Sequence, residues 1–117
     1  MKQELSREAR IRQQQLQRKY IDSLPAKRSR IEEGWKQVQS SSWSDAAVAA
    51  LKADVHRLAG SAGSYGLQEL GDVAARLEST LRSDEGTLGW RKLVFRQVNE
   101  LIQMLGGEMR GGPPITT

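Results

Sequence analysis

The sequence contains no cysteine, only three prolines, one histidine and few aromatic residues. Without cysteine, disulfide bonds and thiolate chemistry are excluded, and a reducing compartment is the natural expectation. One histidine also excludes a metal site built from histidine and cysteine ligands. No apolar run approaches the roughly 20 residues that span a membrane, and the polar start lacks the apolar segment of a signal peptide. We therefore expect a cytoplasmic protein that does not contact membranes.

The length and the charge distribution narrow the possibilities further. The 117 residues suffice for one compact domain and are too few for two. Residues 1–36 hold ten Lys or Arg against five Asp or Glu, so the excess positive charge lies near the N-terminus. Acidic residues are interspersed and no series of aromatic residues accompanies the basic ones. A solvated helix face is therefore favoured over a nucleic-acid-binding surface.

Helical periodicity dominates the chain. Apolar residues recur at spacings of three and four, and no stretch shows the alternation that is typical of a strand. The expected helices are 4–21, 26–39, 46–65, 67–84 and 88–105. The first has a narrow apolar stripe and the other four have wider ones. We therefore expect an all-α protein, an antiparallel up-down four-helix bundle with an additional N-terminal helix.

Each apolar stripe predicts which side chains face the core. The residues expected to be buried are Ile31, Trp35, Val38, Val48, Leu51, Val55, Leu58, Ala62, Leu70, Val73, Leu77, Leu81, Trp90, Val94, Val98, Leu101 and Leu105. The expected domain is 1–105, with 1–22 as its additional helix. The remaining stretch, 106–117, reads GGEMRGGPPITT and predicts a flexible linker or tail because of its glycines and prolines.

The breaks between the helices are marked by residues that stop or cap a helix. Pro25 separates the first two, because the residue before proline avoids helical backbone angles. Ser44 or Asp45 is suited to cap the third helix by accepting a backbone N–H bond. Gly66 is suited to end that helix in the left-handed conformation. The stretch 86–87, Gly followed by Thr, is expected to form the last turn.

The histidine lies in an unusual setting, the stretch HRLAGSAGSYG that begins at His56. Its neighbours on the same helix face are small residues, apart from Lys52. The core-facing stripe passes to one side, so the ring should be exposed at the edge of the core. A glycine inside a helix costs about 1 kcal/mol relative to alanine. Gly60 and Gly63 therefore either allow close helix packing or leave space for a group on the imidazole or for a partner.

The common catalytic arrangements do not fit this histidine. Asp54 and Ser61 project from other faces of the helix, so a Ser-His-Asp triad cannot form. The glycines lack the preceding strand and following GK[ST] of a phosphate-binding loop. An exposed imidazole is largely neutral at about pH 7 and keeps one ring nitrogen free as a nucleophile. It can accept a phosphoryl group while a partner supplies Mg²⁺ and an acidic pocket, because phosphoryl transfer depends mainly on positioning and charge neutralisation.

The stretch HRLAGSAGSYGLQELGDVAARLE, residues 56–78, closely resembles the signature of histidine-containing phosphotransfer (HPt) domains, which are intermediates of bacterial two-component phosphorelays. The matching residues are His56, Leu58, Gly60, Ser61, Gly66, Leu70, Ala74, Leu77 and Glu78. The upstream YIDSLPAKRSRIEEGW, residues 20–35, is similar to the first-helix region of HPt modules attached to response regulators. The resemblance covers most of the chain.

The resemblance implies that His56 is phosphorylated. It would receive a phosphoryl group from a receiver-domain phospho-aspartate and pass it to another receiver aspartate. The partners would be receiver domains of response regulators or hybrid sensor kinases. The protein would be a carrier without autokinase activity rather than an enzyme, and it would bind no cofactor itself, because the partner receiver supplies Mg²⁺. The alternatives are a helical scaffold or docking bundle without phosphotransfer and, less favoured, a basic nucleic-acid-binding bundle.

Several residues are expected to support the histidine. The resemblance implies that Gly60 provides clearance beside it and that Glu78 faces it from the next helix. A carboxylate that accepts a bond from one ring N–H would fix the tautomer and leave the other nitrogen as the nucleophile. HPt domains often carry lysine where this chain has Ala59, so other cations would meet the phosphoryl charge. The candidates by position are Lys52, Arg57 and Arg82, of which the first two are equally compatible with a solvated face.

Overall fold

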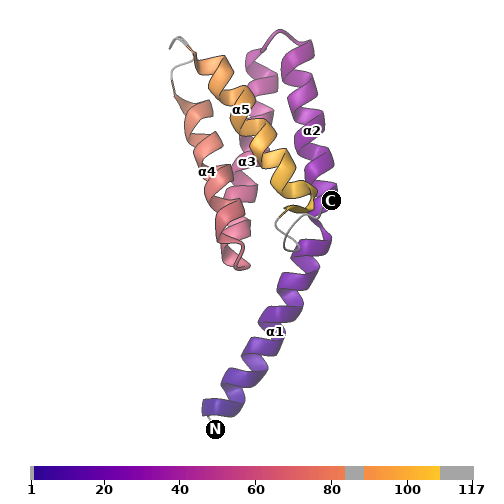
Figure 1. Ribbon diagram of the computed structural model, residues 1–117, viewed down its shortest axis with the longest axis vertical. Helices are drawn as coiled ribbons and strands as arrows, with labels where there is room; N and C mark the ends of the chain where they lie inside the picture. The colour runs from indigo at the N-terminus through magenta and orange to yellow at the C-terminus, as the bar shows by residue number, and fades with distance from the viewer. Residues whose placement is uncertain (1, 84–88, 109–117) are drawn as a thin grey trace.

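The computed structural model describes residues 2–83 and 89–108, with side chains for 7–83 and 89–106. Within these residues the α-helices are α1 (Lys2–Asp22), α2 (Leu24–Ser40), α3 (Asp45–Ser64), α4 (Gln68–Arg82) and α5 (Trp90–Gln103), followed by the π-helical segment η1 (Met104–Glu108). Helices α2 to α5 run alternately up and down side by side, and α1 extends away from one end (Figure 1). The predicted all-α bundle with an additional N-terminal helix is confirmed.

The first two helices are separated by a single residue, Ser23. Pro25 lies in the first turn of α2, where its missing N–H has no helical partner to lose. The break therefore comes before the proline, slightly earlier than predicted. At the start of α3, the side chain of Ser44 accepts a hydrogen bond from the Ala47 N–H at 3.2 Å. Of the two predicted caps, Ser44 is the one that performs this role.

The turn between α3 and α4 contains the left-handed glycine that the sequence predicts. Gly66 has a φ of +84°, the left-handed conformation that glycine adopts at little cost. The Leu67 N–H then reaches back to the Ala62 carbonyl at 2.9 Å, which satisfies one of the last carbonyls of α3. The connection is so short that α4 must return directly along α3.

The structure describes the C-terminal end only in part. The turn expected at 86–87 lies outside the described residues. The helical path continues through η1 to Glu108, three residues past the predicted domain end, and the flexible linker or tail expected at 106–117 stays a prediction. Leu105 of this segment is buried at 2% exposure. Gly106 lies so close to Arg28 of α2 that an added Cβ would be 2.9 Å from its Nη1.

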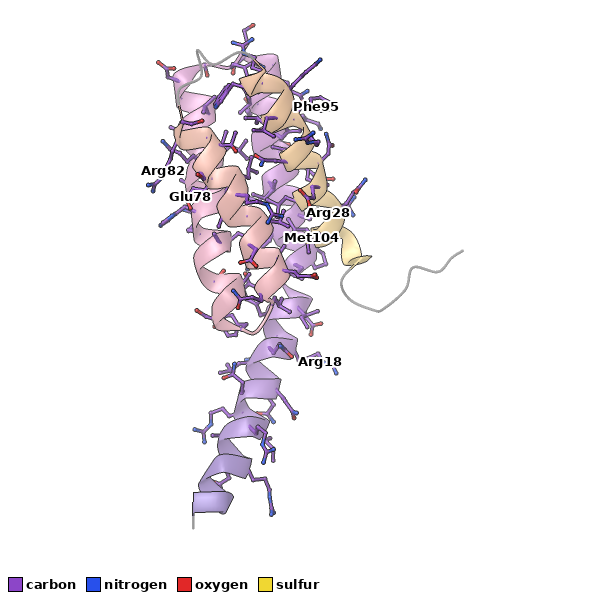
Figure 2. All side chains as sticks on the ribbon, turned by 60° about the vertical axis from the view of Figure 1, so that its left-hand side comes forward. Arg18, Arg28, Glu78, Arg82, Phe95 and Met104 are labelled. Carbon is purple, nitrogen blue, oxygen red and sulfur yellow. The ribbon has the colours of Figure 1, made fainter. Side chains whose placement is uncertain are left out.

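Helix α1 is anchored only near its C-terminal end. Tyr20 is buried, its ring stacks on that of Tyr65 with centroids 4.6 Å apart, and its hydroxyl shares a 2.6 Å hydrogen bond with Ser61. Gln17 donates to the Tyr65 carbonyl at 2.8 Å. Further toward the N-terminus the side chains stand clear of the bundle (Figure 2), and Leu16 is 42% exposed. The narrow stripe predicted on this helix is therefore covered only at its end.

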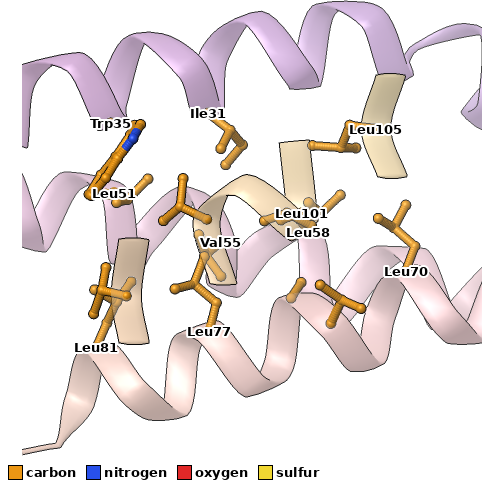
Figure 3. Packing of buried hydrophobic residues seen from close by; sticks show 14 of the residues in the cluster. Ile31, Trp35, Leu51, Val55, Leu58, Leu70, Leu77, Leu81, Leu101 and Leu105 are labelled. Atoms are coloured by element: carbon orange, nitrogen blue, oxygen red, sulfur yellow. The ribbon is translucent and has the colours of Figure 1, made fainter. Parts of the chain in front are cut away.

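The core is one cluster of buried apolar side chains contributed by α2 to α5 and η1, with Tyr20 from the end of α1 (Figure 3). Every residue that the stripes placed in the core is buried, except Val48, which is partly buried and packs against the cluster. Leu24 and Ala74 are also fully buried. Because apolar side chains from all four bundle helices interlock here, the helices are fixed relative to one another.

Helices α3 and α4 approach each other most closely at two glycines. A Cβ added to Gly71 would lie 3.3 Å from the Gly63 backbone nitrogen and 3.5 Å from the Ala59 carbonyl oxygen. Gly71 therefore faces the backbone of α3 at the level of Gly63. Since the helices are antiparallel, two turns back along α3 and two turns on along α4 lead to another facing pair. That pair is His56 and Glu78.

This close approach predicts a stability difference between two alanine substitutions. Gly71→Ala should lower the free energy of unfolding by about 1–3 kcal/mol, because the new methyl group forces the helices apart. Gly63→Ala should raise it by up to about 1 kcal/mol through helix propensity, because a Cβ there meets nothing within 4 Å. Urea unfolding of the two variants measures both values. Equal effects would contradict the close approach.

Candidate functional site

The histidine and the glutamate predicted to face it form a direct contact. Nδ1 of His56 on α3 lies 2.7 Å from Oε2 of Glu78 on α4. The side chain of His56 is 65% exposed, whereas that of Glu78 is 14% exposed. An ionised carboxylate can only accept a hydrogen bond, so a proton on Nδ1 would be donated to Glu78. In that tautomer of the neutral ring, the other nitrogen, Nε2, keeps its lone pair.

A second donor contacts the same carboxylate. Nη2 of Arg82 lies 3.0 Å from Oε2 of Glu78, the oxygen that also accepts from His56. Arg82 is one turn further along α4, and both side chains lie on the same side of the bundle in Figure 2. The structure therefore brings together three of the predicted site residues around one oxygen atom.

The glycine one turn after the histidine faces open space. A Cβ added to Gly60 would meet nothing within 4 Å, so helix packing does not require glycine at this position. At Gly71, by contrast, the close approach of α3 and α4 explains why the residue is glycine. Of the two reasons considered for small residues near His56, close packing accounts for Gly71, and free space beside the ring accounts better for Gly60.

Lys52 lies one turn before His56 on α3 and is partly buried. The register that places Gly63 opposite Gly71 and His56 opposite Glu78 also places Lys52 opposite Arg82. Two cations thus lie at the same level of the α3–α4 pair, on one side of the histidine. The small residues lie on its other side.

Arg57, the third predicted cation, contacts Asp54 and not Glu78. Its guanidinium forms an ion pair with Asp54 on the same helix, and Nε of Arg30 on α2 bonds the same carboxylate oxygen at 3.0 Å. Arg57 also lines a surface cleft of about 840 Å³ between α2 and α3, beside Tyr20 and other residues. The pKa of Tyr20 is raised there, mainly by burial. The structure does not place Arg57 with the group around Glu78.

The sequence itself indicates the pairing of Arg57 with Asp54. Asp54 and Arg57 are three residues apart, a spacing at which opposite charges pair on a helix. The partner from α2, Arg30, could not be foreseen in the same way, because its position depends on how the helices pack.

The described residues thus form a helical bundle with an exposed histidine whose ring is contacted by a carboxylate from the neighbouring helix. The family model described as the Hpt domain matches residues 4–108. The match covers most of the chain, α1 included, and the chain belongs to the Hpt domain family. Hpt domains are histidine phosphotransfer carriers in two-component phosphorelays and interact with receiver domains.

The other comparisons add no relatives. Neither the curated proteins nor the solved structures that were compared with the chain include a match. Among the residues that the structure describes, no helix combines the length and the apolar character needed to cross a membrane.

Proposed function

We propose that His56 is the phosphorylated residue and that it carries a phosphoryl group from the aspartate of one receiver domain to that of another. The observation that supports this most directly is the 2.7 Å contact between His56 Nδ1 and Glu78 Oε2. It leaves Nε2 of an exposed ring as the nucleophile. His56 is the only histidine in the chain.

The transfer follows from this geometry. The lone pair of Nε2 attacks the phosphorus of the receiver phospho-aspartate, the bond from phosphorus to the aspartyl oxygen breaks, and its electron pair remains on the aspartate carboxylate. Nδ1 keeps its proton, so the ring becomes positively charged. Glu78 stabilises that charge because its carboxylate already accepts the Nδ1 proton. Delivery to the second receiver is the same reaction in reverse.

The remaining requirements are space and positive charge. The open space at Gly60 accommodates the phosphoryl group and the approaching receiver. Lys52 and Arg82 contribute positive potential on one side of the ring. The receiver domain supplies Mg²⁺, which neutralises the phosphoryl oxygens during transfer. Because the donor is already an activated acyl phosphate, the chain needs no autokinase activity.

The proposal is tested by transfer from a panel of phosphorylated receiver domains. We expect at least one receiver to label the chain with phosphate that is labile in acid and stable in base, and a second receiver to remove the label. An established Hpt domain, assayed beside it, serves as the positive control. If the control is labelled by the panel and this chain is not, the chain is a docking scaffold without phosphotransfer.

The charge on Glu78 predicts a change in transfer rate. Glu78→Gln can still accept a hydrogen bond, but it no longer stabilises the positive ring, so transfer should slow about tenfold, the difference between a charge-assisted and a neutral hydrogen bond. Rapid-quench measurement of the rate from a labelling receiver tests this.

A matched control for that variant lies on α5. Glu100 is half exposed and lies 3.9 Å from Arg76, far from the histidine in sequence. Glu100→Gln should leave the transfer rate unchanged. Equal slowing in both variants would show that Glu78 acts through overall charge or stability and not through the ring.

A further inference from the structure

One carboxylate oxygen of Glu78 is shared by His56 and Arg82. Glu78 Oε2 accepts from His56 Nδ1 at 2.7 Å and from Arg82 Nη2 at 3.0 Å. The carboxylate is 14% exposed, whereas the two donors are 65% and 63% exposed. The acceptor is therefore held at the helix surface between two side chains that reach it from solvent.

The bond between Arg82 and Glu78 lies within a single helix. Glu78 precedes Arg82 by four residues, which is the favourable order for such a pair. The planar guanidinium presents several N–H donors in a fixed geometry. A glutamate without this partner has several torsions free, and its carboxylate can turn toward water. Arg82 thus restricts Glu78 whether or not the imidazole is in place.

We propose that Arg82 is a positioning residue for phosphotransfer, which acts through Glu78 and keeps the His56 proton on Nδ1. This inference rests on the proposed function only for its effect on transfer, because the tautomer is a property of the chain alone. With Arg82 in place, Nε2 is unprotonated before a receiver arrives. Without it, a larger fraction of the rings carries the proton on Nε2 and cannot attack phosphorus.

Two other roles for Arg82 would have different consequences. As the basic residue of the last turn of α4, it interacts favourably with the helix dipole. That interaction, like an ion pair that only stabilises the fold, changes the unfolding temperature and leaves the ring tautomer unchanged. A general positive potential near His56 is the other possibility, and it would be shared by Lys52, which lies opposite Arg82.

The test is ¹⁵N NMR of the imidazole, combined with the transfer rate from a labelling receiver. The chain has one histidine, so the long-range ¹H–¹⁵N spectrum contains a single ring and reports directly which nitrogen is protonated. The variants are Arg82→Gln, Arg82→Lys and the control Lys52→Gln. Circular dichroism establishes that each is folded, which is expected because the Arg82 side chain is 63% exposed.

We expect Arg82→Gln to lower the population of the Nδ1–H tautomer and to slow transfer about threefold to tenfold, the range for losing one charge-assisted hydrogen bond at a partly exposed site. Arg82→Lys should recover part of both effects, and Lys52→Gln should leave the tautomer unchanged. An unchanged tautomer in Arg82→Gln overturns the proposal whatever the rate. An equal shift in Lys52→Gln overturns it in favour of a general potential. Absence of transfer in the wild type would instead refute the proposed function.

Discussion

Replacing His56 with glutamine is expected to reduce phosphoryl acceptance by at least about a thousandfold, to background, as removal of a nucleophile does in covalent catalysis. Glutamine keeps a polar side chain of similar reach but has no ring nitrogen with a nucleophilic lone pair. No other histidine is available to take the group. Because the side chain is 65% exposed, the free energy of unfolding should change by no more than about 0.5 kcal/mol.

The measurement is the amount of acid-labile phosphate on the chain after incubation with a labelling receiver, with thermal unfolding recorded in parallel. Arg57→Gln is the matched control, because it places the same residue at the next position of α3, where the side chain pairs with Asp54 and not with Glu78. This control should transfer at a rate within about threefold of the wild type. Acid-labile label that persists on His56→Gln would exclude His56 as the carrier.

The bundle could be predicted from the sequence because the pattern and the packing agree. The stripes on the last four helices contain enough large apolar residues to require burial, and spacings of three and four leave helix as the only compatible structure. Gly66 is a similar case, since its left-handed φ of +84° follows from a helix that must reverse within a short connection. Local signals of this kind do not depend on distant parts of the chain.

The parts of the fold that escaped prediction depend on tertiary contacts. The sequence of 106–108 is typical of a linker, yet the backbone is π-helical there and follows the buried Leu105. Likewise Tyr20 belongs to a stripe too narrow to predict burial, and it is buried because Tyr65 and Ser61 are brought beneath it. Neither partner is near in sequence.

The same distinction between local signals and tertiary contacts applies to the candidate site. The family resemblance implied that Glu78 faces His56, and the structure agrees, because the antiparallel register that sets Gly71 against Gly63 also sets Glu78 against His56. The cations could not be assigned by position alone. Arg57 has an acidic neighbour on its own helix that competes for it, whereas Arg82 has Glu78. The spacing along each helix permits both pairs. What the sequence does not specify is the partner from another helix, His56 for the carboxylate of Glu78 and Arg30 for that of Asp54.

A large side chain at Gly60 should separate stability from function. Gly60→Leu is expected to stabilise the folded chain by up to about 1 kcal/mol, because leucine is a far better helix former than glycine. Side chains on a helix lean toward its N-terminus, so a leucine at this position lies over the preceding turn and therefore over His56. Transfer should fall on the order of a hundredfold, since the phosphoryl group and the receiver are kept from their reactive distance.

The variant Gly60→Ala separates the effect of filling the space beside His56 from the effect of merely replacing glycine. Its Cβ meets nothing within 4 Å, so alanine should give most of the same gain in stability while transfer stays within about threefold of the wild type, because a single methyl group does not cover the ring. Rates from a labelling receiver and urea unfolding curves for both variants supply the comparison. If Gly60→Leu transfers as fast as Gly60→Ala, the open space beside His56 is not used in the reaction, and the glycine must be explained by something other than clearance.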